Sequence, residues 1–326
     1  MLRTPICEDL GIEVPIMQAA IWPATSPELV AAVSRAGGLG SIGSVFESAE
    51  SVEKQIARVR ELTDRPFAVN HVVPLLDEEA FEATLEARPA VVSMALGDPG
   101  ELVERAHAAG AKVIHQVHTV EQAHRVAGLG VDAVIAQGSE AGGQGMVLGV
   151  GAMALIPQVV DAVDPIPVLA AGGVADGRGL AAALVLGAQG ANVGTRFLAS
   201  DEASADETWK RAILHTKSED VVRFEVFNEI LPPRSDRAYE TVPRVMRTAF
   251  VEKWQGRPEE ASRQSERLRA ELMSAIKERR PHELLPFTGQ TAGMVHDVFP
   301  AAEIVRMMVA EAEQALERAN ALRGSS

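Results

Sequence analysis

The chain has 326 residues, of which 47% are hydrophobic, and its 45 acidic and 31 basic side chains leave a net charge of −14. Such an acidic chain with only 4% aromatic residues is a poor partner for nucleic acid or for an anionic membrane surface. Cys7 is the only cysteine, so an intrachain disulfide is excluded, and neither a signal peptide nor a long apolar run is visible. We therefore expect a cytoplasmic protein without nucleic-acid or membrane partners.

Strand-like and helix-like segments alternate along the first 216 residues. A helix capped by Ser26 follows the first strand, with Pro27 at its first position. Short apolar runs predict eight strands, at 14–19, 39–44, 67–73, 90–96, 112–117, 133–136, 167–171 and 191–197. Further helices are predicted at 49–62, 78–87, 101–109, 121–127, 152–163 and 179–187.

Eight strand-plus-helix units predict an α/β fold of the (β/α)8 TIM-barrel type. The alternative is a doubly wound open sheet, which usually carries its glycine fingerprint after the first strand. Here the first strand is followed by AAIWPATSP, which contains no glycine. We therefore favour the barrel.

The pattern changes after Thr216. Residues 217–298 lack a strand-helix alternation and include a highly charged amphipathic segment at 258–279, which predicts a helical subdomain or lid. A strong final helix at 299–323 is expected to return to the barrel of residues 1–216 and fill its last helical position.

Glycines follow the last two predicted strands, as Gly172-Gly173 and Gly194-Thr195. A glycine pair alone fits a tight turn equally well. However, the loops after strands seven and eight of a barrel commonly bind phosphate, and glycines let backbone N–H groups approach an anion. Thr195 adds a hydroxyl donor, and the helix that begins at Asp176-Gly177 is expected to point its N-terminus at the same place. Together these features predict a phosphate-bearing cofactor.

The segment 138–151, GSEAGGQGMVLGVG, is the longest predicted loop at the active face of the barrel. A mobile surface loop would explain its glycines, but packing against a flat cofactor would organise them. Asn70 and Gln18, at the ends of the third and first strands, are amides that either bind the ligand or cap a turn.

Other catalytic chemistries find little support in the sequence. His71, His115 and His118 lie at strand ends but have no acidic partner at a metal-ligand spacing, so we expect no metal site. Cys7 precedes the first strand, and no Gly-x-Ser-x-Gly elbow is present, which argues against covalent catalysis. Lys112 begins a strand rather than ending one, which disfavours a Schiff-base aldolase.

Five motifs in this order and spacing, PIMQAA, PFAVN, AVIAQGSEAGGQG, PVLAAGGVADGRG and ANVGTRF, resemble the nitronate monooxygenase (2-nitropropane dioxygenase-like) family. The segment PFTGQTAGMVHDVFPAAEIV is similar to the family's C-terminal region, so the resemblance covers nearly the whole chain. It implies a TIM barrel with an added helical subdomain and non-covalently bound FMN. The family also includes FMN-dependent enoyl-ACP reductases and NADH:quinone reductases, so the implied partners are a small-molecule substrate (nitronate, quinone or enoyl thioester), NAD(P)H in the reductases, and a second copy in a homodimer.

The resemblance also assigns cofactor contacts. It places Asn70, Gln137 and Gly142 at the flavin ring or ribityl chain. Gln18, from its place at the end of the first strand, is a further candidate cofactor residue. It places the flavin phosphate at Gly172, Gly173, Asn192, Val193, Gly194 and Thr195.

One departure from the family pattern concerns catalysis. The glycine loop of the family usually ends in a histidine that acts as a base or proton relay, and this chain has Gln144 there. A glutamine amide forms hydrogen bonds but takes up no proton near pH 7. Proton abstraction from a neutral nitroalkane should therefore suffer most, enoyl reduction should lose its proton donor, and quinone reduction should suffer least.

An alkyl nitronate is already an anion, so its oxidation by flavin and O2 can proceed with Gln144 as an orienting group. We therefore predict an FMN-dependent, nitronate monooxygenase-like oxidoreductase. Quinone and enoyl-ACP reduction are the rival activities, and a flavin-binding barrel without redox turnover or a non-redox phosphate-binding barrel is the alternative of another class.

Overall fold

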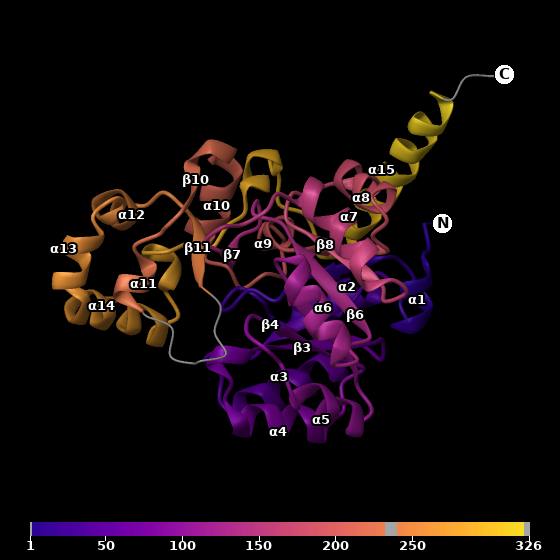
Figure 1. Ribbon diagram of the computed structural model, residues 1–326, viewed down its shortest axis with the longest axis horizontal. Helices are drawn as coiled ribbons and strands as arrows, with labels where there is room; N and C mark the ends of the chain where they lie inside the picture. Colours follow the sequence, from indigo (N-terminus) through magenta and orange to yellow (C-terminus); the bar gives the residue numbers. More distant parts are fainter. Residues whose placement is uncertain (1, 232–239, 323–326) are drawn as a thin grey trace.

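The computed structural model describes residues 2–231 and 240–322 (Figure 1). Its larger part is a barrel of eight parallel strands in the order β1-β9-β8-β6-β5-β4-β3-β2. Leu39 N–H donates to Ile16 O and Gln18 N–H donates to Leu39 O, which joins β2 to β1 and closes the ring. The strands are β1 (Ile16–Gln18), β2 (Gly40–Gly43), β3 (Phe67–Val72), β4 (Val91–Ala95), β5 (Lys112–Val117), β6 (Ala133–Gln137), β8 (Val168–Ala171) and β9 (Gly190–Val193). The TIM-barrel prediction is confirmed.

Helices surround the barrel at the positions that the apolar spacing predicts. The Ser26 hydroxyl accepts a hydrogen bond from Leu29 N–H, as an N-cap should. The final helix, α15 (Ala301–Ala321), packs against α8 and α2, where the helix after the last strand belongs. The other barrel helices are α2 (Pro27–Arg35), α3 (Ala49–Leu62), α4 (Glu78–Ala87), α5 (Leu102–Ala108), α6 (Val120–Gly128), α7 (Ala152–Val163) and α8 (Gly177–Val185).

Strand alternation separates the barrel interior from the layer under the helices. In β3, Ala68 belongs to the interior cluster, whereas Val69 packs beneath the helices. A short N-terminal helix, α1 (Pro5–Asp9), adds the fully buried Ile6 and Cys7 to the interior cluster. This cluster also contains Val91 and Ala133, the first residues of β4 and β6, so α1 closes the end where the strands begin.

The second part of the molecule lies at the other end of the strands (Figure 1, orange). A three-stranded antiparallel sheet joins β7 (Gly143–Met146), β11 (Thr241–Met246) and β10 (Val221–Arg223). Its helices enclose a separate core around Trp254 and Phe224. They are α11 (Phe227–Ile230), α12 (Ala249–Trp254), α13 (Pro258–Arg263) and α14 (Ser265–Lys277).

This subdomain contains several helices, and two of its features differ from the sequence-based expectation. Residues 217–298 contain β10 and β11 as well as helices, and the predicted loop 138–151 contributes β7 to the same sheet. The pairing of β7 with β11 joins segments about 100 residues apart in the chain, which local periodicity does not reveal. In addition, the charged segment 258–279 is divided at Gln264 into α13 and α14.

The remaining helices connect these parts: α9 (Thr195–Leu198), α10 (Glu207–His215), and the 3-10 turns η1 (Val73–Leu75), η2 (Ser218–Asp220), η3 (Pro281–Glu283) and η4 (Gln290–Met294). In the described part of the chain, no helix combines the length and apolar character needed to cross a bilayer.

Candidate active site

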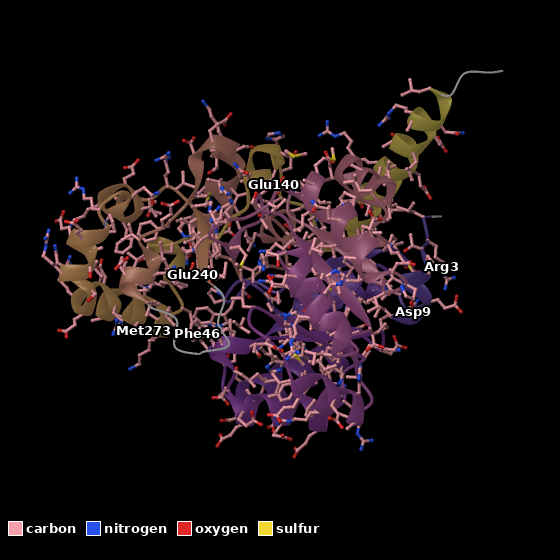
Figure 2. The ribbon with its side chains drawn as sticks, viewed as in Figure 1. Arg3, Asp9, Phe46, Glu140, Glu240 and Met273 are labelled. Atoms are coloured by element: carbon pink, nitrogen blue, oxygen red, sulfur yellow. The ribbon has the colours of Figure 1, made fainter. Side chains whose placement is uncertain are left out.

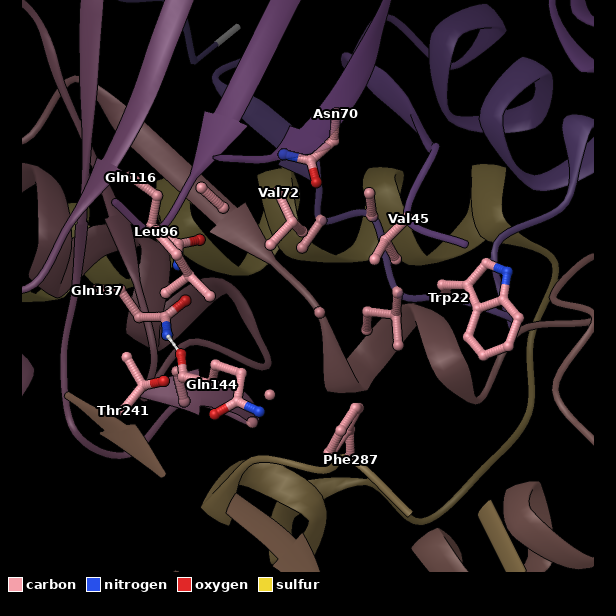
Figure 3. A pocket seen from close by; sticks show the side chains of 18 of the residues that line it. Trp22, Val45, Asn70, Val72, Leu96, Gln116, Gln137, Gln144, Thr241 and Phe287 are labelled. Carbon is pink, nitrogen blue, oxygen red and sulfur yellow. Dashed lines mark hydrogen bonds between the residues drawn. The ribbon is translucent and has the colours of Figure 1, made fainter. Parts of the chain in front are cut away.

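A large pocket lies between the carboxyl ends of the barrel strands and the subdomain (Figure 3). Nine predicted site residues line it: Asn70, Gln137, Gly142, Gln144, Gly172, Gly173, Asn192, Gly194 and Thr195. Because parallel strands all end at the same edge, residues that are up to 125 positions apart in the chain meet here.

Gln18 and Val193 are not among the lining residues. The Gln18 side chain is buried between β1 and β2, where its Oε1 accepts from Ser41 N–H at 2.9 Å. Val193 points away from the barrel interior into the cluster that includes Phe197. Alternation decides both cases, because a residue at a strand end faces the pocket only when its side chain points inward.

Two glycines of the predicted phosphate site have conformations that only glycine adopts easily. Gly172 and Gly173 have φ of +83° and +76°. A Cβ on Gly172 would lie 2.9 Å from Gly138 O, so this turn is tightly packed against the glycine loop. The Thr195 Oγ1 accepts from Gly289 N–H at 2.9 Å, and its own O–H is left to donate.

Two details of the predicted phosphate site are wrong. The eighth strand, predicted to run to residue 197, ends at Val193, and a helical turn begins at Thr195 because the chain leaves the barrel there. The N-terminus of α8 is already satisfied by carboxylates: Asp176 Oδ1 accepts from Gly179 N–H at 3.1 Å, and Glu311 Oε2 accepts from Gly177 N–H at 2.9 Å. The N-terminus of α8 therefore has few free N–H groups that could donate to a phosphate.

Three residues of the pocket lining each carry a buried polar atom without a protein partner. The atoms are Gln144 Oε1, Asn192 Oδ1 and Ser41 Oγ. A buried polar atom without a hydrogen bond is costly, so these atoms are suited to a ligand that donates or accepts. The Gln137 Nε2 donates to Gln144 O at 2.9 Å, which leaves the Gln137 oxygen facing the pocket (Figure 3).

His118 lies behind Gln137, with its Nε2 at 3.2 Å from Gln137 Nε2. Sequence reasoning placed no histidine near Gln144, and only the packing of β5 against β6 reveals this one. Burial lowers the pKa of His118 to about 4, so the ring is neutral at pH 7 and accepts from the Gln137 amide. His71 is remote, held between Ser44 Oγ at 2.8 Å and Thr84 Oγ1 at 3.0 Å.

The lining also includes residues that the sequence analysis did not select. Gln116 and Ser93 face the pocket from β5 and β4. Strand alternation predicts that Gln116 points into the barrel, because it lies on the face opposite to the outward-pointing His115. The Asn70 Nδ2 donates to Ser93 Oγ at 3.0 Å, which turns the Asn70 oxygen toward the pocket (Figure 3).

The described part of the pocket lining carries no charged side chain. Among the described residues that line it, none is Asp, Glu, His, Lys, Arg, Cys or Tyr. The described residues also contain no group of His, Cys, Asp and Glu able to hold a metal ion. The lining can therefore orient a ligand by hydrogen bonds, but it supplies no titratable acid or base.

A closed (β/α)8 barrel with a glycine-walled pocket at its strand ends defines a TIM-barrel enzyme, and comparison with known proteins gives its family. The profile of the nitronate monooxygenase family matches residues 3–83 and 77–311. A probable nitronate monooxygenase from Staphylococcus saprophyticus is 37% identical over an alignment length of 267 residues, and the match covers 68% of this chain and 75% of that protein. The chain belongs to the nitronate monooxygenase family and is an oxidoreductase.

Solved structures agree with this assignment over nearly the whole chain. FabK from Thermotoga maritima superposes with a TM-score of 0.87 at 32% identity, covering 98% of this chain and 99% of FabK. A nitroalkane oxidase from Streptomyces ansochromogenes superposes with a TM-score of 0.80 at 29% identity, covering 95% of this chain and 98% of that protein.

Proposed function

We propose that this chain binds FMN in the pocket and uses it with O2 to oxidise alkyl nitronates. The residues fit the cofactor on two counts. The glycine turn at 172–173 leaves no side chain between the backbone and an anion, and Thr195 can donate to a phosphate oxygen. The oxygens of Asn70 and Gln137 are turned toward the pocket and can accept from the ribityl hydroxyls or the ring.

Bound FMN would supply the redox chemistry for oxidation of the substrate by O2. The protein has three tasks: holding the phosphate with Gly172, Gly173 and Thr195, fixing the ring with amides, and placing the substrate. The side-chain oxygen of Asn192, which is buried without a partner, is a further acceptor for a cofactor hydroxyl.

The absence of titratable side chains among the described lining residues is the observation that favours a nitronate. Abstracting a proton from carbon needs a base within hydrogen-bond reach of it, and a nitronate has already lost that proton. Gln144 reaches into the pocket and can donate its amide N–H to a nitronate oxygen (Figure 3). His118 does not replace the missing base, because Gln137 stands between its ring and the pocket.

The same observation supports NAD(P)H:quinone reduction as the second candidate. Quinone reduction can draw its protons from water, so it too proceeds without an acid in the pocket. Enoyl-ACP reduction is less compatible, because it needs a proton donor at the carbon next to the one that receives hydride.

Anaerobic mixing of the purified protein with propyl nitronate, NADH and NADPH in turn tests this proposal. We expect yellow protein that releases FMN, and bleaching of the flavin by the nitronate. Bleaching by a nicotinamide alone would support quinone reduction instead. Colourless protein that cannot be reconstituted with FMN would refute the proposal.

A further inference from the structure

We propose that a small cavity between the glycine loop (138–151) and the subdomain sheet is a binding site for a monatomic anion such as chloride. The cavity is lined by Arg223 of β10, by Arg244 of β11 and by residues of the glycine loop. Among the described residues, it shares only Gln137 and Ala141 with the large pocket. The site is therefore independent of the proposed nitronate oxidation.

Two arginines with no side chain between them form one wall of this cavity. Arg223 and Arg244 are direct partners in the antiparallel pairing of β10 with β11, so both side chains leave the sheet on the same face. Like charges in directly opposite positions destabilise a sheet, and both of these side chains line the same cavity. A negative charge beside the two guanidinium groups would remove this repulsion.

The described part of the protein supplies no paired carboxylate for these arginines. Its ion pairs include neither Arg223 nor Arg244. Burial and the charge of Arg223 both lower the pKa of the Arg244 guanidinium, and the Glu140 carboxylate acts in the opposite direction. Glu140 lies where the barrel meets the subdomain (Figure 2), but both of its oxygens accept from Ala152 N–H, at 3.0 Å and 2.9 Å. The two positive charges are therefore only weakly compensated.

Backbone carbonyls hold the two guanidinium groups in place but do not neutralise them. Arg244 donates to Ser139 O at 2.9 Å through Nε and to Val221 O at 3.0 Å through Nη1. Arg223 donates from Nη2 to two carbonyls at the carboxyl end of β7. A guanidinium has five N–H donors, so both arginines retain donors for a further acceptor.

His118 adds a third donor at the same cavity. Its Nε2 accepts from the Gln137 amide, so the hydrogen of this neutral ring is on Nδ1. The Nδ1 atom is buried and has no hydrogen-bond partner among the described residues, and His118 lines the cavity. A buried donor without an acceptor is costly. Two guanidinium groups and a ring N–H at one small cavity favour an anion over a cation.

The size of the cavity restricts the anion. Its volume is about 10 Å3, which is close to the space that one water molecule needs. Gly145, which lies directly opposite Val242 in the pairing of β7 with β11, brings no side chain into the cavity. A phosphate or a carboxylate is several atoms wide, whereas a halide occupies one position and accepts from donors in any direction. Chloride is therefore the expected ligand, and water is the alternative.

A chloride titration of the purified holoenzyme tests the site in solution. The melting temperature is measured by circular dichroism as sodium chloride is added, with sodium gluconate keeping the ionic strength constant. At about ten times the Kd, binding favours the folded protein about elevenfold, which corresponds to about 2 °C for a chain of this size. We expect a rise of about that size that saturates.

Variants of Arg223 locate the response. Arg223→Gln removes one of the two charges, and Arg223→Glu places a carboxylate opposite Arg244, so chloride should raise the melting temperature of neither variant. Arg269→Gln is the matched control, because Arg269 Nε also donates to a backbone carbonyl of the subdomain, that of Ile230 at 3.0 Å, but does not line the cavity. Its chloride response should equal that of the wild type. An equal response in the wild type and both Arg223 variants would overturn the proposal.

Crystals of the wild-type holoenzyme grown in sodium bromide give a second readout that needs no variant. An anomalous bromine peak beside the guanidinium groups of Arg223 and Arg244 is expected. A water molecule there without anomalous signal would refute the anion site. A bromine peak without any chloride response in solution would also refute it, because it would show binding at crystal concentration only.

Discussion

Replacing Gly142 with alanine should separate two segments that close the pocket together. Gly142 packs against the 288–289 segment, where an added Cβ would lie 2.6 Å from Gly289 N and 2.6 Å from Thr288 C. Both are backbone atoms, which cannot move aside as the end of a flexible side chain can. The Gly289 N–H also donates to Thr195 Oγ1, so displacement of this segment reaches the proposed phosphate site.

Gly145 offers a matched control in the same loop. It has no atom within 4 Å of an added Cβ, and its φ is not positive. It also lies in β7, paired with Val242, where alanine is tolerated better than glycine. Overpacking typically costs about 1–3 kcal/mol. We therefore expect Gly142→Ala to lower the unfolding free energy by about that amount, and Gly145→Ala to leave it within about 0.5 kcal/mol of wild type.

The same strain should appear in FMN binding. If Gly142→Ala destabilises the FMN-bound protein by about 1–3 kcal/mol more than the apoprotein, the Kd for FMN rises between about fivefold and 150-fold. Urea unfolding of the apoprotein measures the first effect, and flavin fluorescence quenching during titration measures the second. Equal stability and equal Kd in the two variants would refute the close packing of the glycine loop against residues 288–289.

Further predictions concern the proton, an ion pair between the barrel and the subdomain, and the response to acid. Gln144→His should raise turnover of neutral nitroalkanes more than turnover of nitronates in steady-state assays, because the histidine restores a base. Equal effects on the two substrates would show that residue 144 is not at the proton-transfer point. Glu47→Gln should lower the unfolding free energy by about 1 kcal/mol, since it weakens the contact of the buried Glu47 carboxylate with the half-exposed Arg279. Lys54→Gln, in a pair that is exposed on both sides, should have almost no effect in the same urea titration. Burial lowers the pKa of three buried histidines of the barrel (71, 115 and 118) to about 4, against 6.5 for the unfolded chain, so the unfolded state takes up more protons and stability should fall as the pH drops from about 6.5 to about 4. Each contributes on the order of 3 kcal/mol to that loss, and an unfolding free energy that stays constant over this range would contradict their buried, neutral state.

Local patterns in the sequence determined most of the barrel. Short apolar runs place all eight strands, because a strand buried on both faces must be apolar wherever its neighbours lie. Ser26 followed by Pro27 marks a helix start for reasons internal to that turn, and the structure shows the expected cap. Gly172 and Gly173 were predicted from their place after a strand, and their positive φ explains why glycine stands there.

Contacts between distant segments decided the rest. The pairing of β7 with β11 turned a predicted loop into a strand, and Glu311 from the last helix occupied the α8 terminus that sequence reasoning had assigned to phosphate. Asn70 and Gln18 are both amides at strand ends, yet only Asn70 faces the pocket, because the pleat of each strand and the neighbouring strand set the direction of the side chain. The position of Arg223 opposite Arg244 and the contact of the neutral His118 with Gln137 likewise exist only once the chain is folded, since each depends on a partner from another strand.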